Sequence, residues 1–281
     1  MNLRAGVEIV RPINCAMIGF AVIIGEFVSR PAAIPPLQTA LGFMTGFFIC
    51  AYSMAVNDVY DVEVDRVNAP GRPIPSGRIT VGEATRLSIA VLLLGVASSL
   101  LSLNAAAVVI ALIYAMISWL YNSKAKKAGL VGNAIVASSL AIPFIYGGAV
   151  SGGSIFSSLL LTMALTSFFA GVGREVVKAM ADVEGDAKRG IDSVARRRGP
   201  KVAAAAGATF FLLAVFSSWV PLVLGLANET YQVGVIVPDA IFVYLAASIL
   251  RDTRPENAHG VKNRALLGML VGLLVFIGGG V

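Results

Sequence analysis

The chain has 281 residues, of which 57% are hydrophobic and only 14% are charged. Its mean hydropathy is +0.81, whereas an average soluble domain is about half apolar and about a quarter charged. Several apolar stretches reach the length of about 20 residues that a membrane-spanning helix needs. These observations exclude an ordinary soluble domain and predict a single transmembrane domain over residues 1–281.

The formal net charge is +6 at pH 7, which in a soluble protein would suggest nucleic-acid binding. Here the positive charge lies in short segments between apolar stretches, which is typical of membrane topology. We therefore expect no nucleic-acid partner.

The cysteines Cys15 and Cys50 lie inside apolar segments without a CxxC spacing, so we assign them to packing. The basic, apolar start of the chain lacks a small-x-small cleavage pattern, so we interpret it as the first permanent helix.

Nine apolar segments have the length of membrane-spanning helices. The eighth is interrupted by Pro238 and Asp239, which leaves open whether this helix is kinked or begins near Pro238. The sequence therefore predicts an all-α polytopic membrane protein. Its nine transmembrane helices are expected at about 13–28, 37–56, 84–103, 105–121, 130–150, 155–176, 201–226, 232–250 and 265–280.

Basic residues lie almost entirely on one face of this predicted arrangement. Of the 22 Lys and Arg residues, only Arg30 falls on the opposite face. An excess of Lys and Arg marks the cytoplasmic side of a membrane protein. We therefore predict a multi-pass protein of the cell membrane whose cytoplasmic side receives the N-terminus and the segments 57–83, 122–129, 177–200 and 251–264.

A first acidic cluster ends the second predicted span, where Asn57 to Asp65 reads NDVYDVEVD. On a helix, Asn57, Asp61 and Asp65 lie on one stripe, and Asp58 lies beside them. Like charges at this spacing repel one another, and the C-terminal end of a helix also disfavours anions. A bound cation is the natural compensation.

A second acidic cluster ends the sixth predicted span, where Arg174 to Asp186 reads REVVKAMADVEGD. On a continuous helix, Arg174 and Lys178 would share a stripe with Asp182 and Asp186. This order suits an anionic substrate bound through metal, because carboxylates hold Mg²⁺ while bases meet phosphate oxygens. Solvated acids that happen to flank membrane helices are the alternative. Seven of the 16 acidic residues lie in the stretches Asn57–Asp65 and Asp182–Asp186, which favours the metal.

The two clusters share the pattern DVExD at Asp61–Asp65 and Asp182–Asp186, with Glu184 inside the second. Four spans separate them, so the pattern predicts two pseudo-repeated four-helix units plus a ninth helix. Oxygen ligands without His or Cys nearby favour Mg²⁺ over zinc. We expect the Asp61 and Asp182 carboxylates to face one cavity about 6–14 Å apart, because a diphosphate held by two metal ions needs carboxylates on both sides.

Two basic segments are candidates for phosphate binding. Residues 66–78 are rich in proline and glycine, contain three arginines and have the composition of a loop that closes over a diphosphate. A lysine group around Lys126 follows Tyr121, with headgroup attraction as the competing explanation. The single histidine, His259, is expected to be a solvated loop residue.

These motifs resemble those of the UbiA superfamily of intramembrane prenyltransferases, which typically carry an NDxxDxxxD motif and a DxxxD motif. The resemblance covers nearly the whole chain, including the RPIN segment at 11–14 and the pair Tyr121 and Lys126. Within the superfamily, the segments RPIPSGR at 72–78 and GREVVK at 173–178 look like those of the archaeal digeranylgeranylglyceryl phosphate synthases.

The resemblance implies transfer of a geranylgeranyl group from its diphosphate to the hydroxyl of geranylgeranylglyceryl phosphate. It implies Mg²⁺ as cofactor, a prenyl diphosphate and a lipid-like acceptor as substrates, and surrounding membrane lipids; it leaves protein partners unknown. The residues it assigns are Asp58, Asp61 and Asp182 for catalysis, Asn57, Asp58, Asp61, Asp65, Asp182 and Asp186 for metal, and Asn14, Arg72, Tyr121, Lys126, Arg174 and Lys178 for substrate.

Two other functions remain open at this point. Prenyltransferases with aromatic acceptors, which make quinone precursors, share the acidic motifs and the PxPSG loop. A cation transporter with an internal repeat also explains paired intramembrane acids. Transporter sites usually lie near the membrane midplane, whereas these acids are predicted at the cytoplasmic helix ends, which favours the enzyme.

Overall fold

The computed structural model describes residues 2–29, 34–188 and 190–279, without the side chains of residues 68, 184, 188 and 279. Within these ranges the chain forms thirteen α-helices, one 3-10 helix and no strand. Nine of the described helices are long and apolar enough to span a membrane, which confirms the predicted fold class. They are α2 (Pro12–Ser29), α3 (Pro36–Tyr60), α5 (Val81–Leu101), α6 (Ala105–Ser123), α7 (Leu130–Val150), α8 (Ser158–Ala181), α11 (Pro200–Val223), α12 (Glu229–Arg251) and α13 (Pro255–Gly279).

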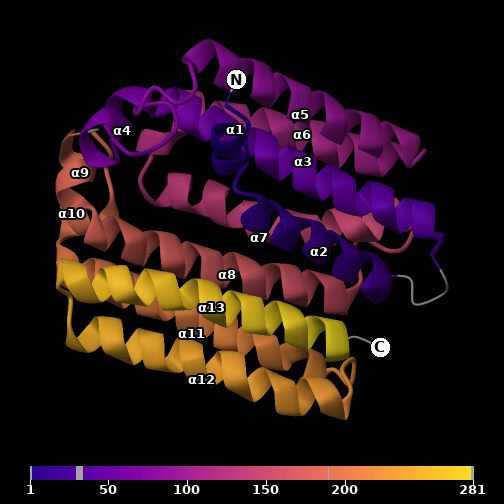
Figure 1. Cartoon of the computed structure of the whole chain (residues 1–281). Coiled ribbons are helices and arrows are strands. Elements are labelled where there is room, and N and C mark those ends of the chain that lie inside the picture. Colours follow the sequence, from indigo (N-terminus) through magenta and orange to yellow (C-terminus); the bar gives the residue numbers. More distant parts are fainter. Residues whose placement is uncertain (1, 30–33, 189, 280–281) are drawn as a thin grey trace.

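The short helices gather at one end of the bundle. Figure 1 shows the N-terminus, α4, α9 and α10 at this end, while the C-terminal end of α13 lies at the other end of the bundle. The predicted cytoplasmic segments meet here, whereas Arg30, the single basic residue predicted on the opposite face, lies outside the described residues. The short elements are α1 (Leu3–Val10), α4 (Val62–Asn68), the 3-10 helix η1 (Ala125–Lys127), α9 (Val183–Lys188) and α10 (Val194–Arg198).

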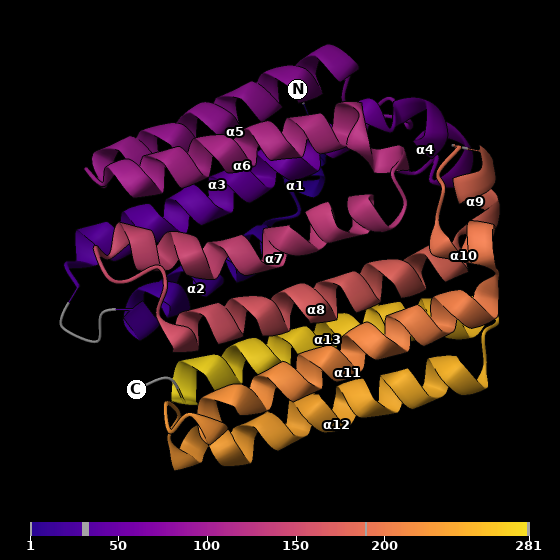
Figure 2. The ribbon, with the colours of Figure 1, turned by 180° about the vertical axis from the view of Figure 1, so that it is seen from behind.

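The nine long helices lie roughly side by side. In both views α5 and α6 form one edge of the bundle, α11 and α12 form the other, and α7 and α8 pass between them (Figures 1 and 2). The pairs α3 with α5, α2 with α7, α7 with α8, and α8 with α11 are in extensive contact. The internal repeat of two four-helix units stays a prediction.

Small residues set the close packing of α2 against α7. A Cβ atom added at Gly25 would lie 2.8 Å from the Phe144 carbonyl carbon, and one at Gly147 would lie 2.7 Å from the Glu26 amide nitrogen. Membrane helices attract each other mainly through such close packing, because lipid is as apolar as the helix surface. Large apolar side chains such as Leu93 and Phe216 are exposed on the outside of the bundle, as expected where lipid is the solvent.

One predicted helix boundary is wrong, and an alternative left open for another helix is excluded. Helix α13 begins at Pro255 rather than near 265, so the exposed His259 lies on a helix and not in a loop. Proline suits the first turn of a helix, where its missing N–H leaves no bond unmade. Helix α12 is continuous from Glu229 to Arg251 with Pro238 inside it. The alternative start near Pro238 is therefore excluded, and Asp239 lies within the span.

Candidate active site

The first acidic motif spans a break between two helices. Helix α3 ends at Tyr60 and α4 begins at Val62, so Asp61 is the junction residue, with φ −92° and ψ 3°. The single continuous helix expected over this motif is therefore wrong. The spacing of four still brings neighbours together, because the Asn57 amide group donates to the Asp61 carboxylate at 3.1 Å.

The acids of the first motif are buried. Asp58, Asp61 and Asp65 have exposed fractions of 5%, 8% and 4%. A buried carboxylate is costly unless it is paired with a cation and hydrogen-bonded. Each of the three has a basic partner, and these partners come from three different parts of the chain.

Arg11 is the partner of Asp58, and sequence analysis did not place it in the site. Its guanidinium donates to the Asp58 carboxylate at 2.5 Å. Arg11 has a φ of 50°, between the end of α1 and Pro12 at the start of α2. Left-handed backbone is uncommon outside glycine and is strained, and such strain gathers at functional sites. The Arg-Pro pair of the RPIN segment was the available signal.

Arg72 is the partner of Asp65, with 2.5 Å between the guanidinium and the carboxylate, and it also lies 3.9 Å from Asp58. Burial acts against the charge on Arg72, but the hydrogen bond and the charge of Asp65 outweigh it and raise the pKa of Arg72. This ion pair fixes the predicted phosphate-binding loop over the acidic motif.

The same loop is anchored to α1. Arg78 donates to both carboxylate oxygens of Glu8, at 2.6 and 3.0 Å, and to the Gly71 carbonyl at 2.7 Å. Ile74 and Ile79 are buried against α1, α3 and α5. The loop therefore packs as an ordered cover beside the acids.

Lys126 completes the pairing of the first motif. On the 3-10 helix η1, it forms an ion pair with Asp61 and donates to the Asn57 side-chain oxygen at 3.0 Å. Tyr121 lies in the last two turns of α6, beside the start of α7 at Gly132. The Lys126 segment therefore reaches the acidic motif, and its binding of phosphate stays a prediction.

The second acidic motif also spans a helix break. Helix α8 ends at Ala181 and α9 begins at Val183, so Asp182 is the junction residue; Asp186, four residues on, is buried. The Glu184 side chain lies outside the described residues. In both views α9 lies at the same end of the bundle as α4 (Figures 1 and 2). The separation of the Asp61 and Asp182 carboxylates stays a prediction.

A backbone hydrogen bond at this end also joins η1, which follows α6, to the segment between α9 and α10. The Asp192 amide, in the segment after α9, donates to the Lys127 carbonyl of η1 at 3.3 Å. The segments that follow the fourth and sixth membrane helices therefore meet, and each lies beside one acidic motif.

The predicted stripe of two bases and two acids on α8 is wrong. The helix ends before Asp182, and Arg174 and Lys178 instead bind the intervening Glu175, at 2.7 and 3.0 Å. Glu175 is buried and was missed as a site residue. Nothing in the local pattern indicated that the acid between the two bases points inward.

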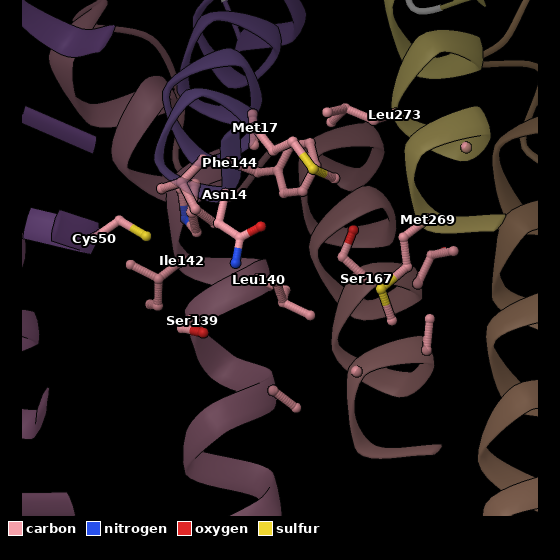
Figure 3. A pocket seen from close by; sticks show the side chains of 18 of the residues that line it. Asn14, Met17, Cys50, Ser139, Leu140, Ile142, Phe144, Ser167, Met269 and Leu273 are labelled. Carbon is pink, nitrogen blue, oxygen red and sulfur yellow. The ribbon is translucent and has the colours of Figure 1, made fainter. Parts of the chain in front are cut away.

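A cavity of about 290 Å³ runs between the two halves of the bundle. Figure 3 shows the Asn14 amide among apolar walls that include Phe144 and Leu140 on one side and Met269 and Leu273 on the other. The walls come from α2, α3, α6 and α7 in the first half and from α8, α11, α12 and α13 in the second, and the cavity reaches Arg174 and Glu175. Such a space suits an apolar chain with a polar head.

Asp239 lies in the wall of this cavity. Its carboxylate accepts hydrogen bonds from the Ser218 hydroxyl at 3.0 Å and from the Trp219 indole at 2.8 Å. The Tyr231 hydroxyl donates to the Ser218 carbonyl at 2.7 Å. This network joins α11 to α12 and satisfies an acid that would be costly in a membrane span.

The donor set of the two motifs fits a hard divalent cation. Carboxylate and amide oxygens are the ligands that Mg²⁺ prefers, and it commonly uses few carboxylates together with substrate phosphates. No group of three or more His, Cys, Asp or Glu residues converges on a single point within the described residues. A metal there would replace ion pairs that the aspartates now make and would share its ligands with the substrate.

Comparisons with known proteins define the class of this site. The model of the UbiA prenyltransferase family matches residues 18–276, so the chain belongs to that family. It is a multi-pass membrane prenyltransferase, and the predicted resemblance is confirmed. The cation-transporter alternative is not favoured.

The similar proteins extend over the whole chain. A digeranylgeranylglyceryl phosphate synthase of Methanocaldococcus jannaschii is 36% identical over 281 residues, covering 100% of this chain and 97% of the relative. One of Archaeoglobus fulgidus is 35% identical, covering 99% and 95%.

Solved structures show the same fold. A structure described as giving insights into the biosynthesis of digeranylgeranylglyceryl phosphate synthase in membranes superposes with a TM-score of 0.80 at 34% identity, covering 99% of this chain and 98% of the other. A UbiA homolog from Archaeoglobus fulgidus bound to GPP and Mg²⁺ has a TM-score of 0.68 at 20% identity, covering 97% and 99%.

Proposed function

We propose that this protein transfers a geranylgeranyl group from geranylgeranyl diphosphate to the free hydroxyl of geranylgeranylglyceryl phosphate. The observation that carries the proposal is the likeness, along the full length of the chain, to digeranylgeranylglyceryl phosphate synthases. The apolar cavity beside a polar end of the bundle supports it, because both substrates carry a phosphate head on a long apolar chain.

In the proposed reaction, the bond between the allylic carbon and the diphosphate oxygen breaks, and its electron pair leaves with diphosphate. A new bond forms between that carbon and the acceptor oxygen, which gives an ether and releases the hydroxyl proton. The allylic cation is delocalised, so the main task of the protein is to stabilise the leaving anion and to exclude water.

The chain's own groups divide these tasks. Arg72 and Lys126 are proposed to bind the diphosphate, since both already lie on the acids of the first motif. Asn14 and Tyr121 are proposed to orient the prenyl end, and Asn14 lies in the cavity. The apolar walls keep water from the cation until the acceptor hydroxyl attacks.

Asn57, Asp58, Asp61 and Asp65 are proposed to hold Mg²⁺ on one side, and Asp182 and Asp186 on the other. When bound, Mg²⁺ neutralises the charge that develops on the leaving diphosphate. The oxygen-only donor set supports this choice. Asp58, Asp61 and Asp182 are the proposed catalytic members, because removing one stabilising interaction with developing charge typically costs about 10²-fold or more in rate.

We also propose that all nine helices act as one domain with the site on the cytoplasmic side. Helices from both halves line a single cavity, which supports one domain. The basic residues gather at the end that carries the acidic motifs, which supports the orientation. Arg198, at the end of α10, is one of several exposed bases there.

The test is acceptor choice. Purified protein receives geranylgeranyl diphosphate, Mg²⁺ and equal amounts of geranylgeranylglyceryl phosphate and 4-hydroxybenzoate, a representative aromatic acceptor. The proposal expects the diether lipid as the main product by mass spectrometry. A prenylated aromatic product with no diether would support the aromatic-acceptor alternative instead.

A further inference from the structure

Glu175 is a buried acid on α8 that holds two bases beside the cavity. Its side chain is only 7% exposed, and each carboxylate oxygen takes one cation: Arg174 at 2.7 Å and Lys178 at 3.0 Å. It lies about 10 Å along the helix axis from the second acidic motif, since seven residues rise 1.5 Å each. The carboxylate therefore fixes Arg174 on the wall of the cavity and Lys178 about one turn further along α8.

Helix α13 brings a third base to the same place. Lys262 is half-buried and lies within electrostatic range of Arg174, Lys178 and Glu175. We name Arg174, Lys178 and Lys262 the α8–α13 basic cluster. Glu175 and Asp182, which also lies within electrostatic range of Lys262, offset two of its three positive charges, so the cluster keeps an excess of one. Such an excess in a partly buried wall favours an anion.

One donor of the cluster is unused. The Nε atom of Arg174 is buried and has no hydrogen-bond partner within the part of the chain that the structure describes. A buried N–H group without a partner is costly, and guanidinium groups pair well with phosphate oxygens. Arg174 lines the cavity, so this N–H is placed to meet the head of a ligand held there.

The α8–α13 basic cluster is separate from the bases of the first motif. Arg11, Arg72 and Lys126 bind acids of the first half of the chain, whereas Arg174 and Lys178 bind an acid of the second half. Two phosphate-bearing substrates repel each other, so a reaction that joins them needs two anion sites. The structure offers one in each half of the bundle.

We propose that the α8–α13 basic cluster, positioned by Glu175, binds the phosphate monoester of the acceptor lipid. The inference rests on the proposed function and assigns one of its two anions. Met269 and Leu273 line the same cavity from α13 (Figure 3), so the acceptor's chain finds an apolar wall on the helix that carries Lys262. Lys262 thus enters the site as a residue that determines acceptor specificity.

The test uses Lys262→Gln, which removes the charge and keeps most of the side chain. We expect the acceptor KM to rise about 10- to 100-fold, the range set by one hydrogen bond to a charged group. The KM for geranylgeranyl diphosphate and kcat should stay within about twofold of the wild type. Arg264→Gln is the matched control, because Arg264 is exposed on the same helix two residues further on.

The phosphate itself is tested with geranylgeranylglycerol, the acceptor without its phosphate. The catalytic efficiency of the wild type should be lower on this acceptor than on geranylgeranylglyceryl phosphate. On the acceptor without phosphate, Lys262→Gln should be as efficient as the wild type. A raised diphosphate KM of Lys262→Gln would overturn the inference, and so would an acceptor KM of Lys262→Gln equal to that of Arg264→Gln. In either case, transfer by the wild type would leave the proposed function intact. No wild-type transfer to geranylgeranylglyceryl phosphate would overturn both.

Glu175→Gln separates positioning from folding. The amide oxygen still accepts a hydrogen bond from one base, whereas the NH2 group in place of the second oxygen cannot accept from the other, and the charge of the two bases is no longer balanced. We expect a raised acceptor KM with an unchanged kcat and an unchanged diphosphate KM. A variant whose kcat and both KM values change together would show a structural role for Glu175 and would remove it from the proposal.

Discussion

Asp61 and Asp182 occupy the same local position at the ends of two membrane helices. Each is the single residue between a long helix and a short one, and each backbone carbonyl accepts a hydrogen bond of 2.8 Å from the amide of the aspartate four residues later. The break turns the chain while keeping the two acids of each motif one turn apart. The matched geometry supports matched roles.

We predict that Asp61→Asn and Asp182→Asn each reduce prenyl transfer by about 10²-fold or more, because each removes a proposed metal ligand at nearly constant volume. The rate of diether formation at saturating Mg²⁺ measures this. Asp192→Asn is the control, since its exposed carboxylate pairs with Arg196 and Arg197 of α10. Turnover near the wild-type rate in either motif variant would refute the metal assignment.

The positions of the spans were predictable, because about 20 consecutive apolar residues have few alternatives to a membrane helix. The breaks at Asp61 and Asp182 were not, since neither site has a proline or a glycine at the break itself and the spacing of acids fits an unbroken helix. The start of α13 at Pro255 was also not predictable from hydropathy. Hydropathy locates the span, whereas residues 255–264 are helical but polar.

The ion pairs between the site residues also could not be predicted from the sequence. Arg11 and Asp58 are 47 residues apart, and Lys126 and Asp61 are 65 apart. Such contacts depend on how α2, α3 and η1 meet in space, which no local pattern records. The sequence did indicate which residue types gather at the end of the bundle.

We predict that Arg11→Ala lowers the free energy of unfolding by about 3 kcal/mol or less. Removing one partner of a buried ion pair costs about 3–5 kcal/mol, and Arg72, 3.9 Å from Asp58, compensates in part. Asp58→Asn in the same chain should recover part of the loss, because no buried charge is then left alone. Thermal unfolding in detergent checks both; equal loss in the single and double variants would contradict the pairing.

We predict that Arg78→Ala raises the diphosphate KM by no more than about fivefold, since an exposed ion pair contributes about 0.2–1 kcal/mol. Arg72→Ala should raise it tenfold or more, because it loses the contact with Asp65 and a proposed phosphate contact. Comparing the two KM values checks the ranking. Equal KM values would show that the Glu8–Arg78 anchor contributes as much to diphosphate binding as the contacts of Arg72.

The Glu8–Arg78 anchor should not respond to pH near neutrality. The hydrogen bond with Arg78 lowers the pKa of Glu8 from its ordinary value of 4.5. Its contribution is therefore fully present above pH 4.5 and is lost only as the pH falls through the lowered value. The ratio of wild-type to Arg78→Ala activity should be constant from about pH 5.5 to 8; a ratio that changes in this range would assign the anchor to another group.

We predict that Asp239→Ala destabilises the protein by about 1–3 kcal/mol, because it leaves the Ser218 and Trp219 donors without their acceptor. Asp239→Asn keeps an oxygen acceptor and should lose less. Thermal unfolding and diether formation are measured on both. Loss of transfer at unchanged thermal stability would instead place Asp239 among the residues that act on the substrate.

The most direct test of the account is the stoichiometry of the reaction with and without divalent metal. Purified protein is stripped with EDTA and supplied with geranylgeranyl diphosphate and geranylgeranylglyceryl phosphate, and diphosphate and diether are counted before and after Mg²⁺ is added. The account predicts neither product without metal and one diphosphate per diether with it. Diether formation at full rate in the absence of any divalent cation would contradict it.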